Sequence, residues 1–149
     1  VKGLVLMTVA MRSKKRGPDA LNMRLAADKS PEAYQTWLEY QRHAMMFVDP
    51  DLRERLMECH EKVGPISQHD DLVVIDKFDV TDRIGDLKAP LVLIRGVDDP
   101  GAPPEYELEI HEAVPGSKYI KLEQAGHFPM AEKPEEVNRA IEELQARVG

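Results

Sequence analysis

Residues 90–104 have the sequence PLVLIRGVDDPGAPP, and this stretch decides the fold of the chain. Leu91 to Ile94 form an uninterrupted apolar run between a proline and a glycine, which is typical of a strand buried on both faces of a parallel sheet. We predict that this strand is central in its sheet. The following loop holds Asp98 and Asp99 at the carboxyl end of the strand, where open parallel sheets bind ligands. On their own, these carboxylates are equally compatible with Asx turns or with a cap for the next helix.

A second stretch, residues 118–129, repeats the pattern of a short strand with polar residues at its end. Tyr119 to Leu122 predict the strand, and Gly126-His127 follow it. Between the two strands, residues 104–114 carry apolar side chains at helical spacing, and Pro115-Gly116 end the helix. A right-handed strand-helix-strand crossover brings both strand ends to one edge of the sheet. We therefore expect a carboxylate and an imidazole to meet there.

These two stretches resemble the C-terminal part of the α/β-hydrolase fold. In that family an acid follows one strand in a Gly-x-x-Asp-x-x-(Val)-Pro setting, and Gly-His follows the next strand. The matching residues here are Gly96, Asp99, Pro103, Gly126 and His127. The resemblance favours Asp99 over Asp98 as the acid, because the family's acid lies four residues before the proline. Ala102 stands where valine is usual, which is a small departure, and the order of acid before histidine agrees with the family.

The resemblance implies catalytic roles for two residues, with His127 as general base and then general acid and Asp99 as its orienting carboxylate. A carboxylate that accepts one ring N–H fixes the imidazole tautomer and stabilises the imidazolium that forms. The implied enzyme is a serine-type hydrolase of a small ester, amide or activated carbon-carbon bond. Dehalogenases, epoxide hydrolases, lyases and haloperoxidase-like members would use the same pair. A non-catalytic ligand-binding or interaction module of the same fold stays open as an alternative.

The nucleophile is not evident in this chain, because the family's Gly-x-Ser-x-Gly turn is absent from the sequence. Residues 1–9 are strongly apolar and resemble the family's sixth strand. We therefore expect the chain to be the C-terminal half of the fold. Its partner would be the N-terminal half, on a second polypeptide or fragment, supplying the nucleophile and the oxyanion hole. The expected architecture is α/β: three parallel strands with flanking helices, plus a helical lid.

Three segments are expected: a core strand at 1–10, a helical lid at 11–78, and the C-terminal core at 79–149. Within the lid, Ser30-Pro31 and Asp49-Pro50 predict helix starts, and Gly64-Pro65 predicts a helix end. The basic run at 11–18 is expected to be a solvated loop, and residues 72–75 are left open as a possible strand. Five apolar side chains are candidates for substrate contact, although simple packing is the alternative. They are Trp37, Met45, Met46, Phe128 and Met130.

Composition excludes several classes of function. The formal net charge of −7 argues against nucleic acid or an anionic membrane as a partner. No apolar run approaches the roughly 20 residues of a membrane span. The single cysteine, Cys59, cannot form an internal disulfide, so we expect a cytoplasmic location. No ligand spacing suggests a metal, and no cofactor is expected. A small-molecule substrate remains as the expected ligand.

Overall fold

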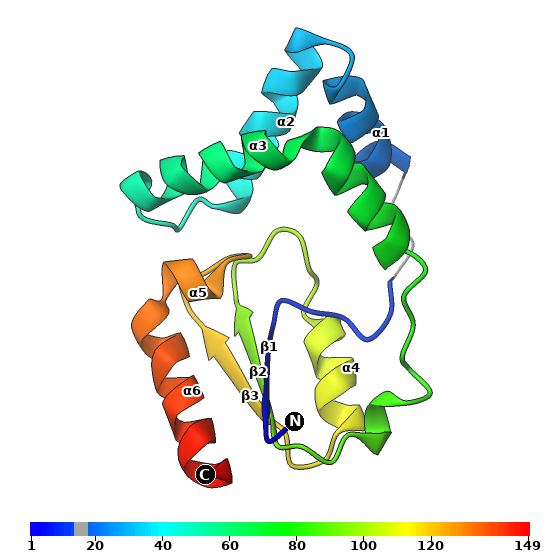
Figure 1. Cartoon of the computed structure of the whole chain (residues 1–149). Helices are drawn as coiled ribbons and strands as arrows, with labels where there is room; N and C mark the ends of the chain where they lie inside the picture. Colours follow the sequence, from blue (N-terminus) through cyan, green and yellow to red (C-terminus); the bar gives the residue numbers. More distant parts are fainter. Residues whose placement is uncertain (14–17) are drawn as a thin grey trace. The chain divides into compact units, whose positions relative to one another are not determined.

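The structure, a computed structural model, describes residues 1–13 and 18–149 (Figure 1). The chain forms two compact units. The first contains Val1–Met11 and Val80–Gly149, and the second contains Arg12–Asp79. The basic run that was expected to be a loop falls partly outside the described residues, since positions 14–17 are not among them.

The first unit is built on a parallel sheet of three strands. They are β1 (Leu4–Met7), β2 (Leu91–Gly96) and β3 (Lys118–Leu122). The order in the sheet is β1-β2-β3, and both neighbouring pairs run parallel (Figure 1). All six residues of β2 are buried. The prediction that the apolar run after Pro90 forms the central strand is therefore confirmed.

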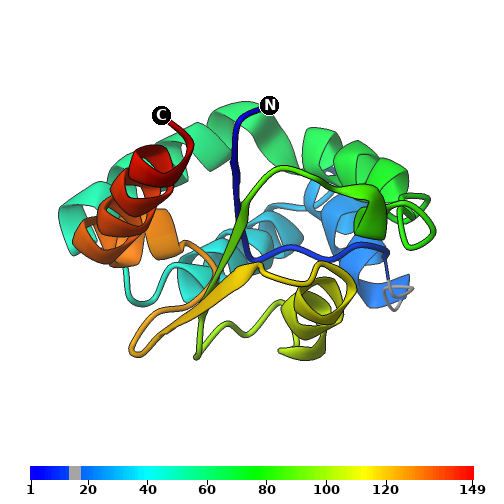
Figure 2. The same cartoon turned by 90° about the horizontal axis from the view of Figure 1, so that it is seen from below.

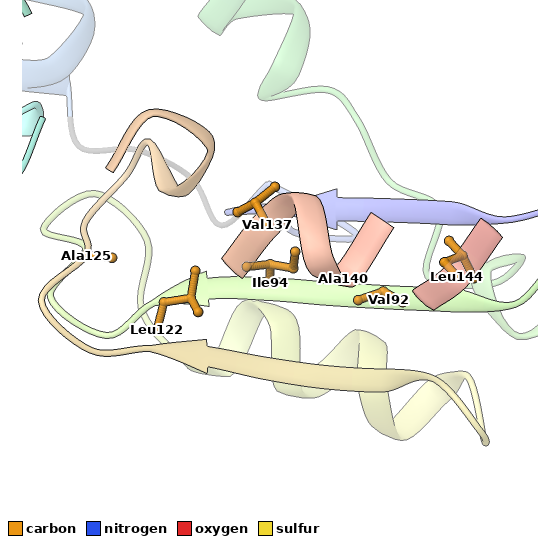
Figure 3. Close-up of a cluster of buried hydrophobic side chains, with 7 residues drawn as sticks. All are labelled: Val92, Ile94, Leu122, Ala125, Val137, Ala140 and Leu144. Carbon is orange, nitrogen blue, oxygen red and sulfur yellow. The ribbon is translucent and has the colours of Figure 1, made fainter. Parts of the chain in front are cut away.

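Helices cover both faces of this sheet, which explains why β2 is apolar without alternation. Figure 2 shows α6 (Pro134–Val148) and α4 (Glu105–Ala113) on opposite sides of the strands. Successive side chains of a strand point to opposite faces. Val92 and Ile94 accordingly belong to the cluster that includes α6 (Figure 3), whereas Leu91 and Leu93 cluster with Ile110 of α4.

The helix α6 packs against the sheet through one apolar stripe. Val137 and Leu144 are buried against the sheet together with Ala140 (Figure 3). Ile141 and Val148 are partly buried at the margin of the same cluster. The glutamates of α6 are exposed, as expected for the solvent side of an amphipathic helix. Two shorter elements complete the unit: the 3₁₀ helix η1 (Ile84–Asp86) and the helix α5 (Pro129–Glu132).

The second unit is helical, with α1 (Pro18–Ala27), α2 (Pro31–Ala44) and α3 (Pro50–Ile75). Ser30 caps α2, because its hydroxyl oxygen accepts from the backbone N–H of Ala33 at 3.3 Å. The Asp49 carboxylate caps α3 by accepting from the N–H groups of the second and third residues that follow it. Both predicted helix starts are confirmed.

The predicted helix end at Gly64-Pro65 is confirmed, because α3 consists of two helical stretches with a kink between them, the second of which continues to Ile75. Gly64 alone leaves the helical region, with φ 79° and ψ 163°. Pro65 then starts the second stretch, where a residue without an N–H is tolerated in the first turn. The possible strand at 72–75 is helical instead. Even α3 does not suit a bilayer: among the described residues, no helix is both long and apolar enough to cross a membrane.

Candidate functional site

The three parallel strands end at one edge of the sheet, and the residues that follow them come together there. Thr8 follows β1, residues 97–104 follow β2, and residues 123–128 follow β3. The Thr8 hydroxyl donates to the backbone oxygen of His127 at 3.3 Å. Thr8 has φ 49°, in the left-handed region that a β-branched residue rarely adopts. The backbone of the His127 loop is thus held from the end of β1.

Asp99 is held in its loop by backbone groups and is aimed at His127. One carboxylate oxygen, Oδ1, accepts from the N–H of Gly101 at 2.7 Å and from the N–H of Ala102 at 3.2 Å. This is the Asx-turn geometry that the sequence left open. The other oxygen, Oδ2, lies 2.9 Å from Nδ1 of His127. Asp99 therefore forms both the turn and the contact with the imidazole.

The two side chains differ in exposure. The Asp99 side chain is fully buried, whereas that of His127 is 39% exposed. An ionised carboxylate only accepts hydrogen bonds, so Nδ1 of His127 must donate. In the neutral imidazole, the other ring nitrogen, Nε2, then keeps its lone pair. An imidazole in this tautomer can take a proton from a reacting hydroxyl group.

The pKa of the Asp99 carboxyl lies below its usual value. Burial opposes ionisation and is the largest single influence. The hydrogen bond and charge of His127, together with the N–H groups of Gly101 and Ala102, outweigh it. Asp99 is therefore ionised at neutral pH and able to stabilise an imidazolium on His127.

Gly96 allows the loops that carry the two residues to approach each other. A Cβ at this position would lie 2.2 Å from the backbone oxygen of Gly126 and 2.4 Å from that of Ala125. The N–H of Asp98 donates to the Ala125 oxygen at 2.9 Å, which joins the two loops directly. The motif glycine is thus required by close backbone approach, not by a left-handed conformation.

Glu132 supports the other side of the histidine loop. Its Oε2 accepts from the N–H of Gly126 at 2.5 Å. Burial raises the pKa of the Glu132 carboxyl and the Asp99 charge adds to the rise, whereas the N–H groups of Gly126 and Phe128 oppose it. Glu132 contacts the residue before His127 and so holds the loop that carries the imidazole.

The structure places the other candidate residues in different settings. Asp98, the competing acid, is exposed. Phe128 packs edge-on against the imidazole of His127, with ring centroids 5.3 Å apart, and Met130 is exposed on α5. In the second unit, Trp37 and Met45 are fully buried and Met46 is exposed. The Trp37 indole N–H donates to Gln68 at 3.0 Å, so this side chain is part of the helical packing.

Several residues at this edge of the sheet were not identified from the sequence: Thr8, Arg95, Glu107 and Glu132. Arg95 and Glu107 form a buried ion pair at 3.1 Å beside the Asp99 loop. Glu107 and Glu132 lie in glutamate-rich segments that have the pattern of solvent-facing helices, so nothing in their spacing distinguishes them. Arg95, which directly follows the apolar run and lies within β2, was the one available signal, because a buried arginine requires a partner.

Within residues 1–13 and 18–149, no group of three or more histidine, cysteine or carboxylate side chains is placed to bind a metal ion.

Comparisons with known proteins find similarity both in sequence and in structure. No protein-family profile matches the chain. BpoC of Mycobacterium tuberculosis H37Rv, named as a non-heme bromoperoxidase, is 36% identical over 62 residues, which are 42% of this chain and 24% of BpoC. An esterase from Thermogutta terrifontis has a TM-score of 0.78 at 24% identity, over 99% of this chain and 56% of its own. The enol-lactonase from Burkholderia xenovorans LB400 has a TM-score of 0.74 at 18% identity, over 98% and 56%.

The chain thus spans about half the length of these solved structures, and its sequence match covers about a quarter of the curated relative. The alignments with the two solved structures cover almost all of this chain. The parallel sheet and its flanking helices give this chain the fold of the C-terminal part of an α/β-hydrolase, and its sequence is similar to that of BpoC over 62 residues.

Proposed function

We propose that this chain supplies the acid and the histidine of a hydrolase triad. His127 is the general base that takes a proton from the nucleophile and the general acid that returns it to the leaving group. Asp99 holds the imidazole in the required tautomer. The observation that carries the proposal is the 2.9 Å contact between a fully buried carboxylate and a partly exposed imidazole at the carboxyl edge of a parallel sheet.

The proposal requires a nucleophile and an oxyanion hole from a segment outside these 149 residues, on the same or another polypeptide. We call this chain together with that segment the assembled hydrolase. The second unit, Arg12–Asp79, is proposed as its lid, because it interrupts the sheet between β1 and β2 in the sequence. The neighbours named as an esterase and an enol-lactonase favour a small ester or lactone as substrate.

Substitution of Asp99 tests the role of the pair. In the assembled hydrolase, Asp99→Asn should lower kcat about 10⁴-fold, by analogy with the serine protease triad, because an amide favours the wrong tautomer of His127. Asp98→Asn is the matched control, since Asp98 is adjacent and exposed, and it should leave turnover unchanged. Wild-type turnover in the Asp99 variant would contradict the assignment.

Labelling with a fluorophosphonate separates an enzyme from a non-catalytic ligand-binding module. A serine nucleophile activated by His127 should be labelled in the assembled hydrolase, and His127→Gln should abolish the label. Absence of label together with absence of ester hydrolysis in the wild-type assembly would favour the binding module. Ester hydrolysis without label would instead point to a nucleophile other than serine.

A further inference from the structure

Arg95 and Glu107 form a buried ion pair whose role is not explained by stability. Arg95 is 4% exposed and Glu107 is fully buried. Nη1 of Arg95 lies 3.1 Å from Oε2 of Glu107. Removing two charges from water costs free energy that their attraction often fails to recover, and apolar residues of similar volume often serve equally well. The contacts that the pair makes therefore matter more than the pair itself.

The second contact of Arg95 leads into the loop that carries Asp99. Its Nη2 donates to the backbone oxygen of Ala102 at 2.7 Å. The N–H of Ala102 in turn donates to Oδ1 of Asp99 at 3.2 Å. Ala102 is thus held at both of its backbone groups, by Arg95 on one side and Asp99 on the other. An unbroken series of contacts runs from Glu107 on α4 to His127.

The contact between Arg95 and Ala102 holds the loop at residues 97–104 in place. Within residues 97–104, Asp99 and Ala102 are the buried residues, and the others are exposed. The start of the loop is tied to the histidine loop through the N–H of Asp98. Its second half is fixed at Ala102 by the guanidinium. A guanidinium presents its donors in a rigid fork, so orienting one arm toward Glu107 also orients the arm that holds Ala102.

We propose that Arg95 and Glu107 are positioning residues for the Asp99–His127 pair. Glu107 orients the Arg95 guanidinium, and the guanidinium fixes the Ala102 carbonyl. This keeps the N–H groups of Gly101 and Ala102 on Oδ1 of Asp99 and leaves Oδ2 directed at Nδ1 of His127. The orientation of Asp99 and His127 is inferred from the contacts alone. The effect of that orientation on turnover rests on the proposed function above.

The tautomer of His127 provides the test. Long-range ¹H–¹⁵N correlation spectra of the 149-residue chain distinguish a neutral imidazole protonated at Nδ1 from one protonated at Nε2. The wild-type chain should carry the proton at Nδ1. The double variant Arg95→Met/Glu107→Leu removes both charges without leaving one unpaired, so it should stay folded. It should nevertheless show a several-fold larger fraction of the Nε2-protonated form.

Two conservative variants keep the test decisive if the double variant does not fold. Glu107→Gln retains a carbonyl oxygen that can accept from Arg95, so it should keep the wild-type tautomer. Arg95→Lys has a single ammonium that cannot hold both partners in one geometry, so it should shift the tautomer. Equal behaviour of these two variants would overturn the inference.

A buried residue on the same helix controls for a merely structural effect. Ile110→Ala creates a cavity in the cluster of Ile110 with Leu91 and Leu93 and removes none of the polar contacts described above, so it should destabilise the chain and leave the tautomer unchanged. A wild-type tautomer in the folded double variant would overturn the inference. So would an Nε2-protonated imidazole in the wild-type chain.

Turnover of the assembled hydrolase supplies a second measurement. The double variant should lower kcat by about 10-fold to 100-fold with KM unchanged, the range expected when a catalytic group is displaced by a fraction of an ångström to about 1 Å. The proposed hydrolase function and the proposed positioning role are contradicted by different results. A wild-type assembly that neither hydrolyses esters nor takes label contradicts the proposed function, whereas the tautomer result in the chain decides the positioning role.

Discussion

At the scale of single residues, Gly96 shows how a motif position follows from backbone packing. Gly96→Ala should destabilise the chain by about 1–3 kcal/mol, the usual range for overpacking, because the new Cβ meets two backbone oxygens that cannot rotate away. Urea unfolding followed by circular dichroism measures the change. Gly85→Ala is the control, since its Cβ would lie 3.4 Å from the nearest atom, an ordinary contact. Equal unfolding free energies for the two variants would contradict this account.

Some residues of the site could be predicted from the sequence, and others became evident only in the structure. Asp99 and His127 were found because each follows a short apolar strand at the spacing of a known motif. Arg95 and Glu107 meet only when β2 and α4 are packed, and the sequence gives no register between a strand and a helix that covers it. Thr8 reaches His127 across most of the chain length. Spacing identifies residues on neighbouring strand ends, but it does not identify those that hold them.

At the scale of elements, α5 is a helix that the sequence did not predict. Its four residues are too few for a helical period to be recognised. The element matters because it brings Glu132 back under the loop of His127. In α3, by contrast, the predicted helix end at Gly64-Pro65 is confirmed, although a second helical stretch follows at once. A glycine with positive φ followed by proline interrupts the hydrogen bonds of a helix, but it does not determine whether another helix follows.

The raised pKa of Glu132 gives α5 a pH-dependent effect on stability. The folded chain keeps the Glu132 proton to a higher pH than the unfolded chain, whose glutamates titrate near about 4.3. Above that value the folded state binds more protons, so the contribution of Glu132 to the free energy of unfolding falls as pH rises through the folded pKa. It is fully present only below about pH 4.3.

Glu132→Gln should remove this dependence, because the amide oxygen still accepts from Gly126 and does not titrate. Relative to the wild type, the variant should gain stability as pH rises from about 4 through the folded pKa of Glu132, and the gain should level off above it. Urea unfolding at several pH values in that range measures the difference. Glu136→Gln, on the exposed side of α6, controls for the loss of one negative charge. A difference that is constant or shrinks with rising pH would contradict the expectation.

At the scale of the whole molecule, β1 differs from β2 in its surroundings. Both strands are apolar, but the residues of β1 are only partly buried, whereas those of β2 are fully buried. In the part of the chain that the structure describes, β1 pairs with β2 on one edge and with no strand on the other. An apolar strand with one free edge is a template for pairing. We propose that this edge receives the sheet of the nucleophile-bearing segment.

The hydrogen bonds of β1 show which groups are available for that pairing. The N–H of Leu4 donates to the oxygen of Pro90 at 2.9 Å, and the N–H of Thr8 donates to that of Ile94 at 3.3 Å. Alternate residues of a strand turn their backbone groups to opposite edges. The N–H and C=O groups of Val5 and Met7 therefore point away from β2.

Hydrogen exchange measures whether this edge is covered on assembly. In the chain alone, the amides of Val5 and Met7 should exchange much faster than that of Leu4, since they have no partner strand. In the assembled hydrolase their exchange should slow by on the order of 100-fold or more, because a parallel neighbour now accepts their hydrogen bonds. The amide of Leu93, inside β2, should be protected in both states. If Val5 and Met7 exchange at the same rate with and without the nucleophile-bearing segment, that segment does not join the sheet at β1, and the proposed assembly is wrong.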